Sequence, residues 1–485
     1  MLFHNPIIRG YNPDPSVCLA NGKYYLVTSS FQYFPGVALF ESADLLNWKQ
    51  IGHCLTRESQ LPLKGARASG GIYAPTIRHD GRRFYMITTN VSKGGNFFVH
   101  TDDIHGEWSD PVHIPQGGID PSLYFEDGRA FLSLPGHDPA DGRPALFLSE
   151  IDIATGVAES PPRPVWHGTG GRYLEGPHLY KIGAWYYMLA AEGGTEYGHM
   201  VTYARSKNIY GPYEAFPGNP VLSNRDLGGH PVQGTGHADL FQDYAGNWWL
   251  VHLAFRAFGH YHHLGRETFL TPVQFRDDGW FTAGANGTVA LEVDAPINAT
   301  QIRKNRFDFD NKGWRHLRAF DSANYVLEKD RLRLRASPDT LDTPNGAPTF
   351  IGLNQEEFDM DFTVRVALTD GEAGVTVYMD EEHRYDLALR KKSDATFAVV
   401  LKLNVGDLKS EKEFPVPTAT AVLRITTDAE KYNFFHGTTL IGSARSKYLS
   451  SEVAGGFTGV ILAFYTQNGG DAFNTFTDFV CEYKA

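Results

Sequence analysis

Residues 12–25 read NPDPSVCLANGKYY, and this stretch is the first copy of a unit that recurs through the first three hundred residues. An acidic residue leads into a short apolar segment, an Asn-Gly pair follows, and two aromatic residues come next. Asn-Gly or Asp-Gly between apolar segments is a strong signal for a tight β-hairpin. Related segments lie at residues 80–85, 127–131, 182–187 and 245–249. We therefore predict five hairpins, one at each turn.

The spacing of the turn glycines indicates how the hairpins are arranged. Gly22, Gly81, Gly128, Gly183 and Gly246 are separated by 59, 47, 55 and 63 residues. Hairpin repeats of about 50 to 60 residues are typical of β-propellers, whose blades have about four strands. The 50 Gly, 27 Pro, 32 Phe, 24 Tyr and 8 Trp suit an all-β chain with many turns. We predict a five-bladed β-propeller over residues 1–295.

One position of the repeat carries reactive side chains. Asp14, Ala74, Asp120, Glu175 and His237 stand 8, 7, 8, 8 and 9 residues before their turn glycines. Equivalent positions in a propeller lie at one radius around one axis. The repeat therefore predicts a central pit that contains three carboxylates and a histidine.

The pattern changes after about residue 300, where strict alternation of apolar and polar residues begins. Residues 331–335, 362–366, 385–389 and 422–426 all show it. Such alternation predicts half-buried antiparallel strands and a β-sandwich domain over residues 305–485. The junction near residues 295–304 is not rich in Gly or Ser, so we expect a docked domain and no flexible tether.

The carboxylates of the pit define a chemistry. A single Asp-Pro-Ser is ordinary turn sequence, but Asp14 and Asp120 carry it at matched positions and Glu175 occupies a third. Paired carboxylates on either side of a bond are the equipment of glycoside hydrolysis. Glu175 has the longer side chain and is assigned as the acid, and Asp14 as the base that activates water. Asp120 is expected to position Glu175 and to raise its pKa by repulsion.

These segments resemble glycoside hydrolase family 43, in its β-xylosidase/α-L-arabinofuranosidase branch. The resemblance covers the whole predicted propeller, and the appended sandwich, expected to be concanavalin-like, matches the architecture of that branch. The segments that carry it are Asn12-Pro13-Asp14-Pro15-Ser16, Ser30-Phe31-Gln32-Tyr33-Phe34-Pro35-Gly36-Val37, Ser69-Gly70-Gly71-Ile72-Tyr73-Ala74-Pro75, Gly118-Ile119-Asp120-Pro121-Ser122, Glu175-Gly176-Pro177-His178 and Leu264-Gly265-Arg266-Glu267-Thr268-Phe269.

The resemblance implies an inverting, exo-acting glycosidase with the same three roles for Asp14, Asp120 and Glu175. It would release terminal α-L-arabinofuranose, β-D-xylose or both from hemicellulose-derived oligosaccharides. The resemblance also implies that Arg266 binds sugar hydroxyls, with a surface ion pair as the alternative. Phe31 and Tyr73 would form apolar walls, with core packing as the alternative. Xylosidase-like members often have Trp where Tyr73 stands, which favours arabinofuranoside.

No cofactor is expected for this chemistry, and no site residue is assigned to a metal. His237 lies where similar enzymes place a histidine, in some members beside a calcium ion, so a calcium there stays an alternative. The cluster at residues 260–263 has no acid or cysteine at ligand spacing and does not predict a zinc site. Phe473, in a Gly-rich turn of the second domain, is a candidate lid residue, with a plain turn as the alternative.

Charge and cysteine content narrow the partners. The chain has 44 basic and 56 acidic residues, a net charge of −12, which argues against nucleic acid. No apolar segment approaches the ~18 residues of a membrane helix, and residues 457–465 are expected to be a buried strand. Without a visible signal peptide, and with only Cys18, Cys54 and Cys481, a cytoplasmic location is expected. Small oligosaccharides are the expected partners, and a homo-oligomer stays open.

Two other functions are compatible with this architecture. Retaining fructan or sucrose hydrolases also join a five-bladed propeller to a sandwich, but they usually carry Asn-Asp-Pro-Asn-Gly and Arg-Asp-Pro segments that this chain lacks. The other is a non-catalytic, carbohydrate-binding propeller. Three acids in one pit disfavour this alternative. Buried like charges lower the stability of a fold, so a site without catalysis would have no reason to retain them.

Overall fold

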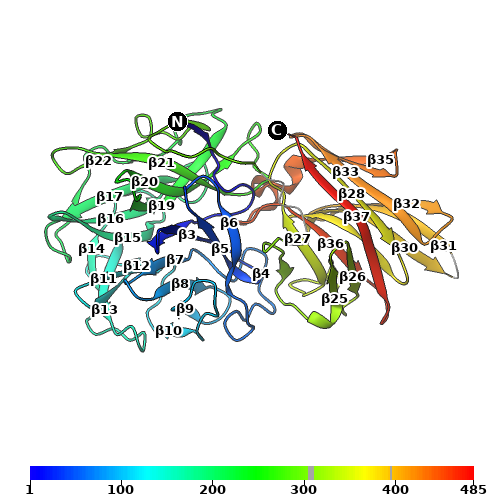
Figure 1. Ribbon diagram of the computed structural model, residues 1–485, viewed down its shortest axis with the longest axis horizontal. Coiled ribbons are helices and arrows are strands. Elements are labelled where there is room, and N and C mark those ends of the chain that lie inside the picture. Colours follow the sequence, from blue (N-terminus) through cyan, green and yellow to red (C-terminus); the bar gives the residue numbers. More distant parts are fainter. Residues whose placement is uncertain (304–310, 394–395, 485) are drawn as a thin grey trace.

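The computed structural model describes residues 1–303, 311–393 and 396–484, and it is built almost entirely of strands (Figure 1). Two parts lie side by side. We call residues 1–295 the five-sheet region and residues 311–484 the two-sheet region. In the described residues, helical structure is confined to η1 (Ser322–Asn324), η2 (Ser446–Leu449) and α1 (Ser451–Ala454). An all-β fold is confirmed.

The five-sheet region consists of five four-stranded antiparallel sheets, each formed from consecutive parts of the chain. Every predicted hairpin joins the first two strands of one sheet. The sheets are β2 (Ser16–Ala20), β3 (Lys23–Thr28), β5 (Gly36–Ser42) and β6 (Lys49–Leu55); β7 (Thr76–His79), β8 (Phe84–Asn90), β9 (Gly95–Thr101) and β10 (Val112–Ile114); β11 (Ser122–Glu126), β12 (Arg129–His137), β13 (Pro144–Ile151) and β14 (Arg163–Trp166); β15 (Glu175–Ile182), β16 (Trp185–Glu192), β17 (Met200–Ser206) and β18 (Glu214–Ala215); and β19 (Val232–Gln242), β20 (Trp248–Arg256), β21 (Glu267–Phe275) and β22 (Phe281–Ala283).

The turn residues explain why two of these hairpins are so tight. Asn21 and Gly22 have φ of 52° and 77°, and Asp127 and Gly128 have φ of 51° and 74°. Two consecutive left-handed residues make a type I′ turn, whose twist matches that of paired strands. Asn, Asp and Gly tolerate this conformation best, so the turn chemistry read in the sequence is confirmed.

The first strands of the five sheets contact one another in a closed cycle, in the order β2, β7, β11, β15, β19 and back to β2. A buried polar cluster joins them, which we call the hub. Asp239 of β19 accepts hydrogen bonds from Arg78 of β7 at 2.7 and 3.0 Å, from the Ser16 hydroxyl at 2.6 Å and from the Tyr180 hydroxyl at 2.5 Å.

The remaining strand of the cycle, β11, joins the hub through His178 of β15. Its Nδ1 lies 3.0 Å from both the Arg78 guanidinium and the Ser122 hydroxyl of β11. Burial raises the pKa of Asp239, but Arg78, His178 and the hydrogen bonds lower it by more, so this carboxylate is held ionised. The hub therefore links the first strands of all five sheets.

The chain ends of this part are also tied together. β1 (Leu2–His4) pairs with β23 (Glu292–Asp294), so the segment before the first sheet is bound to the segment after the last one. The N-terminal ammonium group adds a hydrogen bond of 2.6 Å to the carbonyl of Ala295.

The two-sheet region packs a seven-stranded sheet against a six-stranded one. Buried residues from both sheets, among them Val364, Leu387 and Phe464, form one core. In sheet order the strands are β25 (Tyr325–Glu328), β26 (Arg331–Arg335), β37 (Phe473–Tyr483), β28 (Met360–Ala367), β33 (Thr420–Thr427), β34 (Lys431–His436) and β35 (Thr439–Arg445), and then β27 (Thr349–Asn354), β36 (Ile461–Gln467), β29 (Glu372–Tyr378), β30 (His383–Ser393), β31 (Thr396–Val405) and β32 (Leu408–Val416).

The predicted alternation is confirmed in β26, β28 and β33, where every second residue is buried. It is wrong for residues 385–389 of β30, all of which are buried. One face of this strand packs into the sandwich core, and Ala388 on the other face belongs to an aromatic cluster between the two regions. The apolar segment 457–465 is also only partly a strand, since β36 begins at Ile461.

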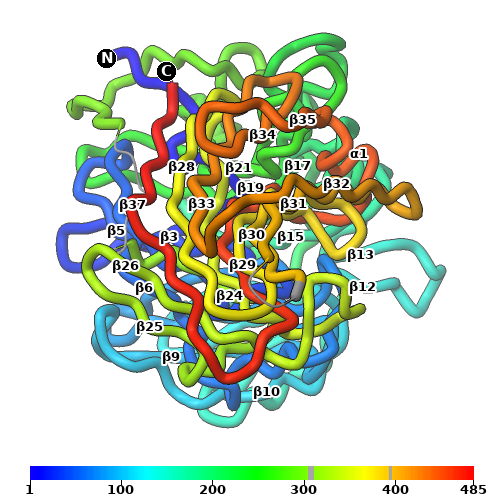
Figure 2. Tube along the Cα trace, turned by 90° about the vertical axis from the view of Figure 1, so that its right-hand side faces the viewer, coloured from blue at the N-terminus to red at the C-terminus, as the bar shows by residue number. Residues whose placement is uncertain are grey.

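The two regions are docked, as the junction predicted. β4 (Tyr33–Phe34) of the first pairs with β24 (His316–Leu317), and a cluster that includes Tyr11, Phe31, Tyr378 and Tyr465 spans the interface. Figure 2, viewed from the side of the two-sheet region, shows that region in front of the five sheets. The predicted start of the second domain, residue 305, lies outside the described residues.

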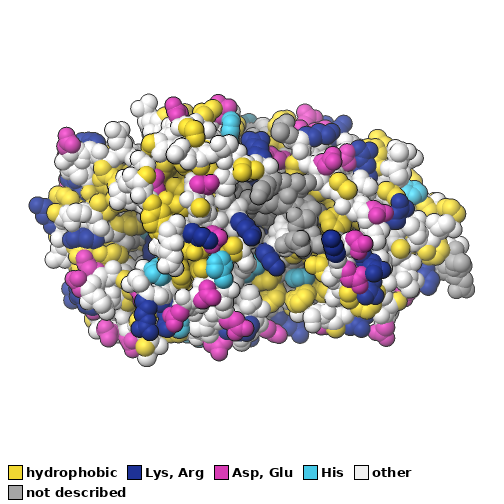
Figure 3. All heavy atoms as spheres, viewed as in Figure 1, with side chains coloured by type: hydrophobic (Ala, Val, Ile, Leu, Met, Phe, Trp, Pro, Cys, Tyr) yellow, Lys and Arg dark blue, Asp and Glu magenta, His cyan; other side chains and the backbone are white. Residues whose placement is uncertain are grey.

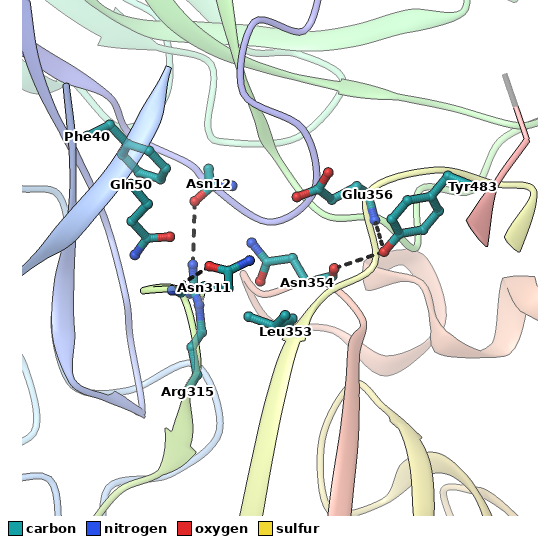
Figure 4. Close-up of a pocket in the computed structure, with 10 residues that line it drawn as sticks. Asn12, Phe40, Gln50, Asn311, Arg315, Leu353, Asn354, Glu356 and Tyr483 are labelled. Atoms are coloured by element: carbon teal, nitrogen blue, oxygen red, sulfur yellow. Dashed lines mark hydrogen bonds between the residues drawn. The ribbon is translucent and has the colours of Figure 1, made fainter. Parts of the chain in front are cut away.

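Part of this interface anchors the segment that leads to Asp14. The Arg315 guanidinium donates to the Asn12 side chain at 3.4 Å, and the Asn354 amide donates to the carbonyl of Tyr11 at 2.8 Å. Figure 4 shows the small cavity of about 20 Å³ beside these residues, with Tyr483 hydrogen-bonded to Asn354 and Glu356. The two-sheet region thus holds the Tyr11 backbone and the Asn12 side chain, which lie three and two residues before the predicted base.

The surface carries charges of both signs (Figure 3), and the cysteines are buried. On the face shown in Figure 3, acidic and basic side chains are interspersed. All three cysteines are buried and free. Within the described part of the chain, no helix is long and apolar enough to cross a membrane.

Candidate active site

The seven residues predicted for catalysis and substrate binding line one pocket of about 310 Å³. The five equivalent repeat positions all reach it, Ala74 included. Four of them lie at or just before the start of a first strand, and His237 lies in the middle of β19. The pocket is lined by Asp14, Phe31, Tyr73, Ala74, Ile119, Asp120, Tyr173, Glu175, Gly194, Thr195, Glu196, His199, His237, Arg266 and Phe457. Residues as distant in sequence as Asp14 and Phe457 therefore meet at one place.

The backbone at three of these positions is left-handed. Asp14, Asp120 and His237 have φ of 55°, 51° and 48°. For a residue with a side chain this conformation costs about 1–2 kcal/mol. Because the same departure recurs at equivalent positions, it belongs to the repeat and aims each side chain into the pit. Glu175 is placed differently, at a register shift of β15 that precedes Gly176 at φ 59°.

Asp14 is held as a carboxylate. Arg266 donates to its Oδ1 at 2.9 Å and the Ser29 hydroxyl donates to its Oδ2 at 2.5 Å. Burial raises the pKa of Asp14, but Arg266, His237 and the Ser29 hydrogen bond lower it by more, so it lies below its ordinary value. Asp14 is therefore charged at neutral pH.

Glu175 is shifted in the opposite direction. Burial and the negative charge of Asp14 raise the pKa of Glu175 to about 7, against a smaller opposing effect of Arg266. Burial, Glu175 and Asp14 also raise the pKa of Asp120 well above its ordinary value. The Gly176 amide donates to Asp120, which ties that carboxylate to the backbone next to Glu175. At neutral pH Asp14 is therefore ionised, whereas the pair of Glu175 and Asp120 retains a proton.

Arg266 is buried and does not form the surface ion pair considered as its alternative. Its Nη1 donates to Asp14 and, at 2.8 Å, to the Thr195 hydroxyl, and its Nη2 donates to the carbonyl of Phe457 at 3.1 Å. Gly265 precedes it at φ 82°, where a Cβ would lie 2.8 Å from the Cα of Gly459. This close approach places Arg266 against the two-sheet region.

Phe31 and Tyr73 form one wall together with Phe457. The ring centroids of Phe31 lie 5.2 Å from Tyr73 and 5.9 Å from Phe457. Phe31 is buried in the interface cluster and also lines the pocket, so core packing and wall formation are both true of it. Tyr73 is half-buried.

Sequence reasoning missed Phe457 and wrongly offered Phe473. Phe473 does not line the pocket; it begins β37, and the guanidinium groups of Arg333 and Arg335 lie 5.6 and 5.8 Å from its ring. Phe457 reaches the pocket from the loop before β36, where its amide donates to the Ser69 hydroxyl at 2.8 Å. The apolar run that contains it was visible in the sequence, but its loop conformation was not.

Other missed pocket residues come from loops outside the repeat. Thr195, Glu196 and His199 lie between β16 and β17, and Tyr173 lies just before β15. His199 is buried beside His237, and burial followed by the charge of His237 lowers its pKa to about 3. No periodic signal in the sequence marks these positions.

The side chains at both candidate metal positions have other partners. Asp14 and Asp239 are the carboxylates that act electrostatically on His237, and each forms an ion pair with an arginine. In the cluster at residues 260–263, His262 forms an ion pair of 2.5 Å with Glu452. Over the described ranges, the one group of three metal-binding side chains is Asp138, Asp141 and His167, and it contains neither cluster.

This arrangement has a definite chemical capacity. A charged carboxylate, a carboxylic acid that keeps its proton near pH 7, a buried arginine and an aromatic wall face one pocket. A base and an acid whose pKa values are driven apart by their surroundings are what glycosidic bond cleavage requires. Fold and site together define a glycoside hydrolase.

Comparison with known proteins gives the family. Residues 3–281 match the model of glycosyl hydrolases family 43, and residues 306–481 match that of the beta xylosidase C-terminal concanavalin A-like domain. The chain therefore belongs to glycosyl hydrolase family 43 and is a glycosidase.

Three relatives illustrate the similarity. The non-reducing end alpha-L-arabinofuranosidase of Bacteroides ovatus is 40% identical over 98% of this chain and 93% of its own length. The xylosidase/arabinosidase of Butyrivibrio fibrisolvens is 34% identical over 99% and 98%. Among solved structures, the Bacteroides ovatus xyloglucan PUL GH43B superimposes with a TM-score of 0.91 at 37% identity, over 99% of this chain and all of that one.

Proposed function

We propose that this protein is an inverting, exo-acting glycosidase that releases terminal α-L-arabinofuranose, β-D-xylose or both from hemicellulose-derived oligosaccharides. One observation carries the assignment of roles. In a single pocket, the pKa of Asp14 lies below its ordinary value while that of Glu175 is raised to about 7. Around neutral pH the site therefore holds a base that is deprotonated and an acid that is protonated.

The reaction follows from these two states. A water molecule attacks the anomeric carbon, Asp14 accepts one of its protons, and the new carbon–oxygen bond forms. At the same time Glu175 gives its proton to the glycosidic oxygen as the bond between that oxygen and the anomeric carbon breaks. Inversion needs a gap of about 6.5–9.5 Å between the two carboxyl groups, so that water fits.

Asp120, Arg266 and the aromatic wall have supporting roles in this proposal. Asp120 binds the Gly176 amide and thereby fixes the segment of Glu175. Arg266 keeps Asp14 ionised, and its Nε–H has no acceptor in the described part of the chain, so it is available to a sugar hydroxyl. Phe31, Tyr73 and Phe457 cover the apolar face of the terminal sugar.

The fold that carries this site is proposed to be a five-bladed β-propeller. The five sheets would be its blades and the cycle of first strands its centre, with the pairing of β1 and β23 closing the ring. A pocket of about 310 Å³ is at the small end of ligand sites, about 300–1,000 Å³, which suits one terminal sugar.

The substrate proposal rests on the relatives and on Tyr73. One relative is named an arabinofuranosidase and another a xylosidase/arabinosidase.

We propose that no metal is required. Calcium binds through several oxygen ligands, and the two carboxylates that act on His237 are already bound to Arg266 and Arg78, so these residues do not fit that ion.

The test compares kcat/KM on 4-nitrophenyl α-L-arabinofuranoside and 4-nitrophenyl β-D-xyloside. We expect turnover of at least one, with the arabinofuranoside preferred. Failure to hydrolyse either substrate, by protein whose folding is verified, would contradict the proposal.

A further inference from the structure

Tyr173 is an exposed aromatic residue at the rim of the pocket. It stands two residues before Glu175 and lines the same pocket, yet 61% of its surface is accessible. Its φ of 52° is left-handed, which is unfavourable for a bulky residue. Strain of this kind persists where the surrounding structure enforces it, commonly at functional sites.

The loop that presents Tyr173 is held by a buried carboxylate. Glu192, at the end of β16, accepts hydrogen bonds from the Thr169 amide at 2.9 Å, the Gly171 amide at 2.7 Å and the Thr202 hydroxyl at 2.7 Å. The Gly193 amide adds a bond of 2.6 Å to the carbonyl of Arg172. The exposed ring therefore projects from a fixed backbone.

The Tyr173 ring has two close neighbours and packs into no core. The Arg172 guanidinium lies over the ring, 4.8 Å from its centroid. Gly194 packs closely against it, since a Cβ there would lie 3.0 Å from a ring carbon. Tyr173 belongs to none of the apolar clusters of the described residues. Folding alone does not account for this ring.

Tyr173 and Glu175 line the same pocket and are two residues apart in the chain. Glu175 must reach the glycosidic oxygen, and beyond that oxygen lies the rest of the substrate. Phe31, Tyr73 and Phe457 contact one another and form the wall. Tyr173 lies outside this wall, on the loop that leads to Glu175. A pyranose ring has an apolar C–H face that packs well on an aromatic side chain.

We propose that Tyr173 is the stacking platform for the sugar residue of the leaving group, which makes it a specificity-determining residue for oligosaccharide substrates. This inference rests on the proposed function. It names a pyranose as the ligand and places it on the side of the acid, away from the terminal sugar.

The experiment compares substrates that differ only in their leaving group. Arabinofuranosyl-xylose and xylobiose carry a pyranose leaving group, whereas the corresponding glycosyl fluorides carry one atom that cannot reach the ring. Tyr173→Ala should lower kcat/KM on the disaccharide about tenfold and leave that on the fluoride within about twofold of wild type. Tyr173→Trp and Tyr173→Phe should retain activity on the disaccharide.

Tyr244→Ala is the matched control, because Tyr244 is 54% accessible and lies in the turn between β19 and β20, outside the pocket. It should change neither substrate. Equal losses on fluoride and disaccharide in Tyr173→Ala, or no loss on either, would overturn the platform. Failure of the wild type on both substrates would instead overturn the proposed function itself, so the two failures are distinguishable.

Discussion

Glu175 in the five-sheet region and Glu372 in the two-sheet region are both largely buried, but their pKa values are shifted in opposite directions. Glu372 accepts hydrogen bonds from Lys402 at 2.8 Å, Arg390 at 2.6 Å and Tyr465 at 2.9 Å. Burial raises its pKa, but Lys402 and Arg390 lower it by more. Glu175 forms no ion pair with any described residue, and its pKa rises to about 7.

This difference distinguishes a buried carboxylate that stabilises the fold from one that can take part in a reaction. A buried carboxylate with two cations and several donors is a fixed part of the scaffold, since each oxygen is satisfied. A buried carboxylate beside other acids keeps its proton and can deliver it. The two-sheet region contains the first kind and contributes Phe457 to the pocket, whereas the five-sheet region carries the three acids that line it.

The largest effect is expected when the ionised acid of the pit is removed. Asp14→Asn preserves shape and tolerates the left-handed backbone, but it cannot take a proton from water. Turnover should fall at least about 10³-fold on every substrate, activated ones included. Steady-state kinetics on a natural oligosaccharide and on an aryl glycoside measure this, and substantial residual activity on the aryl glycoside would count against Asp14 as the base.

Glu175→Ala should show a loss that depends on the leaving group. Natural linkages need a proton from the acid and should lose about 10³-fold. A 2,4-dinitrophenyl glycoside leaves without that proton and should lose far less. Kinetics on both substrates decide the matter, and equal losses would argue against Glu175 as the acid.

Glu372→Gln is the counterpart in the two-sheet region. Loss of this charge removes the partner of Lys402 and one of the three carboxylate partners of Arg390. It should destabilise the protein by about 3 kcal/mol, with kcat of the folded enzyme unchanged. Glu175→Gln should do the reverse, lowering kcat while leaving stability equal or higher. Urea unfolding midpoints and kcat of both variants test this, and a loss of kcat in folded Glu372→Gln would erase the distinction.

Phe457→Ala tests how much the two-sheet region contributes to the site. Loss of this ring from the wall should lower kcat/KM about 10- to 100-fold, because the terminal sugar loses apolar contact. The carbonyl that binds Arg266 remains, so the pH profile should keep its shape. A variant with unchanged kcat/KM on a disaccharide would show that the wall works without the second region.

The smallest expected effect is the change in kcat/KM for each unit of pH. Glu175 acts when protonated, so kcat/KM should fall about tenfold per pH unit as pH rises through about 7. Asp14 acts when ionised, and its lowered pKa puts the acid limb below the ordinary value of 3.8. Glu175→Ala, assayed on the dinitrophenyl substrate, should lack the alkaline limb; its persistence there would assign the limb to another group.

The sequence repeat predicted the all-β fold, the five hairpins and the convergence of the pit because hairpin turns are local signals. Asn-Gly and Asp-Gly marked three of the turns, and a similar spacing from the turn glycines identified Asp14, Asp120, Glu175 and His237 as neighbours. The resemblance to a known family added Arg266, Phe31 and Tyr73, and the structure brings all of these residues to one pocket.

Residues outside the repeat could not be found this way. Tyr173 and His199 come from loops outside the repeat, and the loop of Phe457 is held by a hydrogen bond from its amide to Ser69 of the other region. Phe473 had a similar Gly-rich setting but is the first residue of β37. Such placements depend on contacts between distant segments, which no local pattern records.

The central claim is that Asp14 activates water directly while Glu175 protonates the leaving group. The stereochemistry of the first-formed sugar tests it most directly, by proton NMR during the first moments of hydrolysis of the preferred aryl glycoside. We predict that the anomer opposite to the substrate appears first and then equilibrates. Initial release of the same anomer as the substrate would mean a covalent intermediate and would contradict the account.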